Sequence, residues 1–347
     1  MRVRPRPWPG AIVLLAALHL AVLSAEFFAP CAPDQQHRDA PYAPPTRIHV
    51  VDAAGAWHAV PFVYAPAGTP GADAREDTSR RFPLRLLAAG PGYRLAGLVP
   101  ARRRLVSVDP PARLFVLGTD RFGRDLWSRL IVGARYSLFA GLLAAALALG
   151  VGGLIGGTAG YAGGWADDAL MWAADLFMSL PWVYLLLAAR SLLPLDLSPS
   201  VALVATAALM GAIGWARPAR IIRSAVASWR SSDDALAARA IGATPVRIVA
   251  RHLVPLAAGV LVTQAALAVP RFVLAEITLS FLGLGAPEPA PSWGTLAAGM
   301  IPPGLVASHW WLASPLAAMV FVFVLYDRAA LALERPPAWH VLTPNGR

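Results

Sequence analysis

Residues 233–255 read DDALAARAIGATPVRIVARHLVP, and they set charged and turn-forming residues between two long apolar segments. Ser232, just before this stretch, and Asp233 and Asp234 supply a polar cap and negative charge, which favour the positive N-terminal end of a helix. Alanines continue that helix. Gly242 can end that helix in a left-handed conformation, and Thr244 and Pro245 suit the cap and first turn of the next helix. The stretch therefore predicts two short helices separated by a break. Lying across the cytoplasmic face of a membrane protein, they would offer a contact to a soluble partner.

The composition is typical of a membrane protein. Hydrophobic residues make up 57% of the 347 residues and charged residues only 14%, which argues against a soluble globular domain. All 30 basic residues are arginine, so the chain lacks the lysine that the phosphate loop GxxxxGK[ST] of ATPases requires. Any ATP-driven function therefore needs separate ATPase subunits. The net charge of +10 comes from arginines spread over the loops between apolar segments, which indicates membrane topology rather than nucleic-acid binding.

The sequence offers no pattern for catalysis, a cofactor or a metal. Cys31 is the single cysteine, which excludes an intrachain disulfide and a multi-cysteine metal site and predicts an ordinary free thiol. The seven histidines are scattered and form no HxxxH pair. No GxSxG or GxGxxG motif stands in a suitable context. We therefore predict no catalytic residues, no metal and no cofactor.

Six segments are apolar and long enough for transmembrane helices, which need about 20 residues to cross a hydrocarbon core of about 30 Å. They are residues 11–28, 136–160, 169–193, 199–216, 253–282 and 305–332. Pro181 in the third predicts a kink. Arginines before the first segment, in residues 217–251 and after the sixth predict that both termini and this loop are cytoplasmic. A cleaved signal peptide is the competing interpretation of residues 1–25.

Between the first two segments, residues 30–117 are the one region suited to folding in water. The predicted strands are residues 47–51 and 57–64, joined by a turn into a hairpin, and residues 84–87, 105–108 and 114–117. The three arginines at 102–104 are predicted to form a solvated charge run. The fold class that follows is an all-α polytopic membrane protein with six transmembrane helices. A small β-rich extracytoplasmic insert separates helices 1 and 2.

Small and charged residues inside the apolar segments mark further candidates. Gly152, Gly156 and Gly160 recur on one face of the second segment, and such a face lets helices approach closely in lipid. Charged residues are costly in a membrane and are therefore candidates for function. Those within or near the apolar segments are Asp175, Arg190, Arg271 and Glu276. Arg190, near a segment end, is interpreted as extending its charge to the interface.

Several short motifs carry a resemblance to a known family. Ala237 and Ala238, followed after three residues by Gly242, resemble the "EAA" coupling loop of ABC importer permeases. The stretches GTDRFGRD at 118–125, GYAGGW at 160–165, LSFLGLG at 279–285 and PSWG at 291–294 are similar, in the same order, to dipeptide/oligopeptide importer permeases. The resemblance runs from Gly118 to the end of the chain. It identifies the chain as a member of this permease group, of the C-type subunit.

The resemblance implies an organisation and a set of partners. Residues 1–29 would be an anchor helix, 30–117 the insert, and 118–347 the permease domain with its coupling loop at 217–252. The chain would work in the bacterial inner membrane beside a homologous second permease subunit. Two ATP-binding subunits and an extracytoplasmic solute-binding protein would complete the importer, with no nucleic acid. Peptides, nickel complexes and sugars all remain open as substrates, with peptides favoured.

The resemblance also assigns roles to residues. Those expected to couple to the ATPase are Asp233, Asp234, Leu236, Ala237, Ala238, Arg239 and Gly242. Those expected to form a structural loop that docks the binding protein or caps a helix are Gly118, Thr119, Asp120, Gly123, Arg124 and Asp125. Those that could line the translocation path are Trp182, Glu276 and Ser280. For Glu276, a structural role toward another helix or the second permease subunit stays open.

One departure from the family and two other function classes stay open. Leu236 stands where the family usually has glutamate, and Asp233, one turn earlier, is hypothesised to supply the missing charge. An ion-coupled secondary transporter would use Asp175, Arg190 or Glu276. An intramembrane hydrolase would use Asp175 or the pair Asp120 and Asp125. The first lacks discernible repeats and the second lacks a convergent site.

Overall fold

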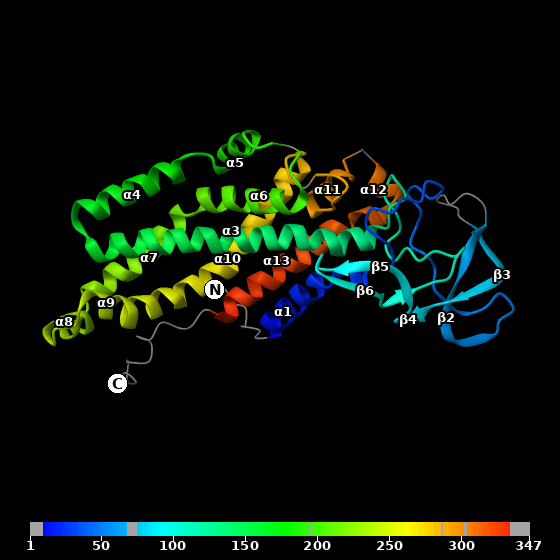
Figure 1. The fold of residues 1–347 in the computed structure, drawn as a ribbon, viewed down its shortest axis with the longest axis horizontal. Helices are drawn as coiled ribbons and strands as arrows, with labels where there is room; N and C mark the ends of the chain where they lie inside the picture. Colours follow the sequence, from blue (N-terminus) through cyan, green and yellow to red (C-terminus); the bar gives the residue numbers. More distant parts are fainter. Residues whose placement is uncertain (1–9, 68–74, 195, 286, 302–303, 334–347) are drawn as a thin grey trace, which may run out of the picture.

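The computed structural model describes residues 10–67, 75–194, 196–285, 287–301 and 304–333. The helices are α1 Gly10–Leu23, α2 Ala25–Phe28, α3 Leu126–Ala162, α4 Gly164–Ser179, α5 Trp182–Ser191, α6 Pro199–Gly214, α7 Ala216–Arg230, α8 Asp233–Ala240, α9 Pro245–Ile248, the π-helix η1 Val249–Leu253, α10 Val254–Phe281, α11 Trp293–Ala298, α12 Leu305–Ser308, the 3-10 helix η2 Trp310–Ala313 and α13 Ser314–Leu333. They form an elongated bundle with the β strands at one end and α8 and α9 at the opposite end (Figure 1).

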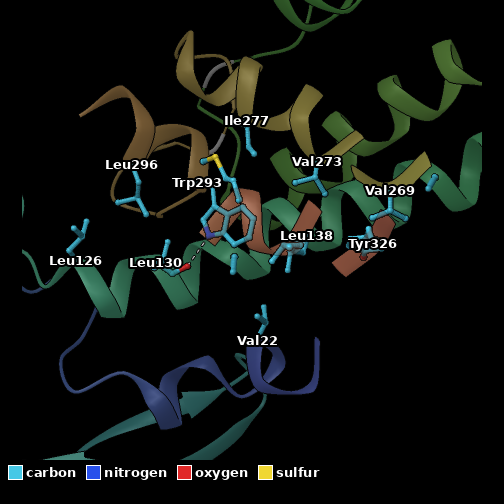
Figure 2. Packing of buried hydrophobic residues seen from close by; sticks show 14 of the residues in the cluster. Val22, Leu126, Leu130, Leu138, Val269, Val273, Ile277, Trp293, Leu296 and Tyr326 are labelled. Atoms are coloured by element: carbon cyan, nitrogen blue, oxygen red, sulfur yellow. Dashed lines mark hydrogen bonds between the residues drawn. The ribbon is translucent and has the colours of Figure 1, made fainter. Parts of the chain in front are cut away.

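Helix α3 runs along the length of the bundle (Figure 1). Its 37 residues correspond to about 55 Å at 1.5 Å per residue. It begins earlier than the predicted residue 136, because the Asp125 carboxylate accepts the Ser128 amide at 2.8 Å and caps the helix. The first half of α3 packs with α10, α11 and α13 around Trp293, whose indole nitrogen donates to the Leu130 carbonyl at 3.0 Å (Figure 2).

Among the described residues, three helices are long and apolar enough to cross a membrane: Leu126–Ala162, Ala257–Phe281 and Trp310–Leu333. Two further helix pairs qualify if each counts as one broken span, α4 with α5, bent by 84°, and α6 with α7, bent by 47°. The sharper bend falls at Pro181, as predicted, since proline cannot continue a regular helix. Helix α1 has only 14 residues. The described chain thus holds three to five candidate spans rather than the six predicted.

Helix α7 occupies a region that was predicted as loop. The fourth predicted segment ends at 216, but the chain continues as a helix to Arg230. Ala219, Ile222 and Val226 repeat at helical spacing and are buried. This apolar stripe lies on the glycine face of α3, where a Cβ on Gly156 would come within 2.1 Å of the Ala219 carbonyl oxygen. The predicted close packing at the glycines is confirmed, and it is α7 that occupies this face.

The β region is small and antiparallel. Strands β1 His49–Val51, β2 Trp57–Ala67 and β3 Arg75–Pro83 form one sheet in that order; β4 Arg85–Leu86 pairs with β7 Val106–Ser107, and β5 Ala89–Leu95 pairs with β6 Val99–Arg103. The predicted hairpin is confirmed, since Val51 pairs with Trp57 across the turn. Val63, Phe82 and Leu114 close a small core beneath the larger sheet.

Two predictions for this region are wrong. Residues 114–117 form no strand, because the amide and carbonyl of Phe115 bond to the Thr46 side chain and amide instead of to a strand. Arg104 is not part of a solvated run. It is buried, its guanidinium donates to the Ala29 carbonyl at 2.5 Å, and it lies over the Tyr93 ring. This arginine therefore ties the β region to the chain that follows α2.

Candidate functional site

The segment between α7 and α10 forms two short helices separated by a break, as predicted. The Ala235 amide donates to the Ser232 hydroxyl at 3.4 Å, so Ser232 supplies the polar cap predicted for α8. Gly242 has a φ of +72°, the left-handed conformation that ends the helix. Thr244 then caps α9, accepting the Arg247 amide at 3.3 Å.

One side of α8 is turned into the protein and the other outward. Ala235 and Ala238 are buried, whereas Leu236 is 57% exposed and Ile241, just after the helix, is 83% exposed. Among the other residues expected to couple, Asp233, Ala237 and Gly242 are exposed, and the backbones of Asp234 and Arg239 belong to α8. The outward side therefore presents large apolar side chains to whatever meets this end of the bundle.

The segment is anchored by a core at the end of α7. Ile222, Val226, Ile248 and Leu253 are buried together, and Trp229 stacks on the His252 ring with centroids 5.3 Å apart. His252 lies in η1, where a π-helical turn joins α9 to α10. The segment is thus carried by α7, which itself packs along α3. Motion of α8 would be passed directly to the longest helix.

At the other end, residues 118–125 form a compact loop. Gly118 and Gly123 each have a φ of +71°. A Cβ on Gly123 would come within 1.9 Å of the His37 carbonyl oxygen, so that position has no room for a side chain. The Thr119 hydroxyl accepts the Ala43 amide at 2.7 Å and donates to the Ala40 carbonyl at 2.6 Å. These contacts fasten the loop to residues 37–43 of the insert.

The charged residues of the loop are also engaged inside the protein. Asp120 accepts hydrogen bonds from the amide and the Nε of Arg124, and Arg124 pairs with Glu288 at 2.9 Å. Asp125 caps α3, and burial raises its pKa to about 6. The prediction of a structural, helix-capping loop is confirmed for Asp125.

Sequence reasoning missed the residues of this loop that face outward. Arg121 and Phe122 are exposed, and the guanidinium carbons of Arg121 and Arg124 lie 4.5 Å and 4.6 Å from the centre of the Phe122 ring. It also missed Arg129 of α3, whose buried guanidinium donates to the Pro33 carbonyl at 3.1 Å. Arg121 and Phe122 lie within the motif at residues 118–125, and Arg129 lies just after it. Only the fold distinguishes the side chains of this region that face inward from those that face outward.

The three residues expected along the path are not brought together. Trp182 lines a cavity between α5, α6 and α10, whereas Ser280 lines a different pocket of about 300 Å³ beside the 118–125 loop. Glu276 is fully buried in α10; Ser280 donates to its Oε1 at 2.5 Å, and its Oε2 has no partner among the described residues. Glu276 and Ser280 therefore form a buried pair, and Trp182 stands apart from them.

Two other charged intramembrane candidates, Asp175 and Arg190, have structural partners. Asp175 of α4 pairs with Arg220 of α7. Arg190 does not extend to an interface as predicted: it is buried and lies within 3.4 Å of the Leu193 and Pro194 carbonyl oxygens at the end of α5. Its charge is held by backbone carbonyls. In the part of the chain that the structure describes, no three histidine, cysteine, aspartate or glutamate residues gather in a group that could hold a metal ion.

Comparison with known proteins gives consistent relatives. The family model described as "Binding-protein-dependent transport system inner membrane component" matches residues 131–335. The dipeptide transport system permease protein DppC of Bacillus subtilis (strain 168) is 36% identical over 202 residues, 58% of this chain and 61% of that protein. The oligopeptide transport system permease protein OppC of the same strain is 35% identical over 193 residues, 56% of this chain and 61% of that protein. The chain thus spans about 61% of the length of either relative.

Among solved structures, the chain is similar to one from the MetNI methionine ABC transporter in an inward-facing conformation. The TM-score is 0.45 and the sequences are 21% identical; the match covers 59% of this chain and 96% of that chain.

Proposed function

Because the chain belongs to the family of binding-protein-dependent transport system inner membrane components, we propose that it is a membrane-spanning permease subunit of an ATP-driven importer. The observation that carries this proposal is the family match over residues 131–335, which includes the outward-facing helix α8. The relatives named as dipeptide and oligopeptide permeases favour di- or oligopeptides as substrates. ATP hydrolysis would take place on separate subunits, since the chain has no lysine for a phosphate loop.

The proposed topology has six crossings. Helix α1, although short, packs on α3 and α13, where the Tyr326 hydroxyl and the His19 ring lie 3.0 Å apart. Counting α1, α3, the pair α4–α5, the pair α6–α7, α10 and α13 places both termini in the cytoplasm with α8. The insert then lies outside the cell membrane. The separation of the β region and α8 at opposite ends of the bundle supports this arrangement (Figure 1).

The proposed division of labour follows the chain. Residues 1–29 anchor it, residues 30–117 form the extracytoplasmic insert, and residues 118–347 form the permease domain. A solute-binding protein would deliver substrate on the side of the insert. Two ATP-binding subunits would meet the part of residues 217–252 that lies beyond α7, which includes α8, and the equivalent segment of a homologous second permease.

The proposed mechanism uses α8 as the moving contact. Its outward residues Asp233, Leu236 and Ala237 would seat in a groove of the ATPase, while buried Ala235 and Ala238 hold the helix on the protein. ATP closes the ATPase pair, and α8 passes that motion through α7 to α3. The spans would then alternate between outward- and inward-facing states, because ATP binding favours one state over the other.

Crosslinking from the exposed side of α8 tests the proposal. In membranes that hold the whole importer, Ala237→Cys should crosslink to an ATPase subunit, with a yield that changes when ATP is added. Buried Ala238→Cys, one residue on, is the matched control and should react far less. Burial raises the pKa of Cys31 to about 12, so the native thiol should contribute little, and Cys31→Ser removes it entirely.

Two results would bear on the proposal differently. A nucleotide-dependent crosslink to an ATPase identifies both the contact and its cytoplasmic side. If Ala237→Cys reacts with a cytoplasmic thiol reagent but captures no ATPase, the importer assignment fails, and a gradient-driven transporter becomes the better account of the chain.

A further inference from the structure

A cavity of about 420 Å³ lies beside the breaks of two bent helix pairs and beside a proline within α10. The break at Pro181 separates α4 from α5, the bend at Trp215 separates α6 from α7, and Pro270 lies inside α10. Residues on both sides of each irregularity line the cavity, among them Leu180 and Trp182, Gly214 and Ala216, and Ala268 and Arg271. Irregular backbone at membrane depth is tolerated where it lines a cavity. The two breaks and Pro270 thus border the same cavity.

Most of the residues that line the cavity are apolar. Phe177, Met178, Leu186 and Phe272 belong to it. Trp182 is 48% exposed and Leu274 is 50% exposed, so about half of each of these large side chains is left uncovered by the described chain. Such a wall suits apolar side chains of a guest molecule.

Two arginines, Arg217 and Arg271, complete the lining. Neither is within salt-bridge distance of a carboxylate of the described residues. The one hydrogen bond that either makes runs from the Nε of Arg271 to the Leu267 carbonyl at 3.2 Å. The end groups of both guanidinium ions are therefore available to an anion.

Two other arginines of α7 do have acidic partners. Arg220 and Arg223 follow Arg217 on α7 at intervals of one helical turn, and they pair with Asp175 and Asp167 of α4. Arg217 alone of the three turns to the cavity and has no such acid. Arg217 is exposed, so an anion that enters the cavity can reach its guanidinium group.

We propose that this cavity is the substrate subsite for the carboxyl end of a peptide. Arg217 and Arg271 bind the free C-terminal carboxylate, and the apolar wall around Trp182 takes the neighbouring side chains. Two guanidinium groups match a carboxylate in charge and in hydrogen-bond geometry. The inference rests on the proposed transport function and adds to it the chemical feature of the substrate that the permease itself recognises.

The experiment uses the complete importer reconstituted in nanodiscs without its binding protein. The affinities of labelled trileucine and of trileucine amide, which lacks the carboxylate charge, are measured at equilibrium. Wild type is expected to bind the free acid at least about 10-fold more tightly, the size of one charged hydrogen bond. The double variant Arg217→Gln, Arg271→Gln should bind both peptides equally. Arg220→Gln, which lies outside the cavity, is the matched control and should keep the preference.

Each other outcome overturns the inference. Equal binding of acid and amide by wild type excludes a carboxylate subsite. If the double variant keeps the preference but loses anionic lipid or the second permease subunit on purification, the arginines serve a lipid phosphate or an acidic side chain of that subunit. ATP-driven uptake of trileucine by wild type in proteoliposomes with the binding protein is measured in parallel. Uptake without acid preference leaves the transport function intact and removes only the subsite; no uptake removes both.

Discussion

The loop at residues 118–125 and the helix α8 lie at opposite ends of the bundle and are built in opposite ways (Figure 1). In the loop, Thr119 and Asp125 are fully buried and hydrogen-bonded within the chain. Among the α8 side chains that the structure describes, those of Ala235 and Ala238 are buried, whereas Leu236 points out. Gly123 of the loop and Gly242, just after α8, both have positive φ, but of these two only Gly123 is enclosed by other atoms.

This difference shows which of the two segments is held in place by contacts within the chain. The loop joins the insert, α3 and Glu288 through hydrogen bonds made within the chain. Helix α8 has the caps that a helix needs but few contacts on its outer side. That outer side is therefore free to bind a partner. Substitutions in the loop should therefore mainly lower the stability of the protein, whereas substitutions on the outer side of α8 should mainly impair coupling to the ATPase.

The largest expected effect separates the two glycines. Gly123→Ala should lower the free energy of unfolding by about 3 kcal/mol, because left-handed backbone strain adds to a clash with the His37 carbonyl. Gly242→Ala has the same φ penalty without the clash and should cost about 1 kcal/mol. Thermal unfolding of the purified protein in detergent measures both. Equal losses would show that the two surroundings do not differ as described.

A second prediction compares two threonines. Thr119→Val removes a hydroxyl that bonds two buried backbone groups, and should cost about 2–3 kcal/mol. Thr244→Val removes an exposed cap of α9 and should cost about 1 kcal/mol or less. The same unfolding assay ranks them. A larger loss at Thr244 would contradict the view that the loop is the more tightly built segment.

A third prediction concerns pH. Burial raises the pKa of Asp125 from 3.8 to about 6, so the folded state holds this proton more tightly than the unfolded state. The free energy of unfolding should therefore fall by about 1–2 kcal/mol as the pH rises from about 4 to about 6, and stay lower above that. Asp125→Asn keeps an oxygen for the cap and should remove this slope. Asp233→Asn at exposed α8 should leave the slope unchanged, and a slope that survives Asp125→Asn would assign it to another group.

The smallest effect on stability is expected at the outer side of α8. Leu236→Glu should change the unfolding midpoint little, whereas Ala238→Glu buries a charge and should lower it clearly.

If Asp233 supplies the negative charge of the coupling contact, Asp233→Asn should reduce ATPase stimulation by the binding protein about 2- to 5-fold. Adding Leu236→Glu should restore it. Full stimulation in Asp233→Asn would show that packing rather than charge holds the contact.

Local signals predicted much of the helical part. Gly242 and Pro245 placed the break after α8, Pro181 placed the sharpest bend, and the glycine spacing of α3 predicted a close helix contact. These features depend on the conformational limits of glycine and proline, which act within a few residues. Helix α7 was missed although Ala219, Ile222 and Val226 repeat at helical spacing, because its arginines were interpreted as a cytoplasmic loop.

Long-range pairing was the part that sequence reasoning could not supply. From the sequence, Arg104 was interpreted as part of a solvated run, Arg190 as reaching an interface and Arg217 as part of a cytoplasmic loop. One is buried on the Ala29 carbonyl, one lies against the carbonyls that end α5, and one turns to a cavity without an acid. Each outcome depends on atoms far away in sequence or on the angle at which two helices cross.

By itself, the sequence determined that this chain is a polytopic helical membrane protein and a relative of binding-protein-dependent permeases. It did so because apolar length, arginine distribution and short motifs are properties of neighbouring residues. The tertiary structure alone decided that α7 fills the glycine face of α3, that the 118–125 loop is fastened to the insert, and that Arg217 and Arg271 meet at one cavity. The reason is that burial and pairing of a charge are set by which distant segments pack together, and packing is a property of the whole fold.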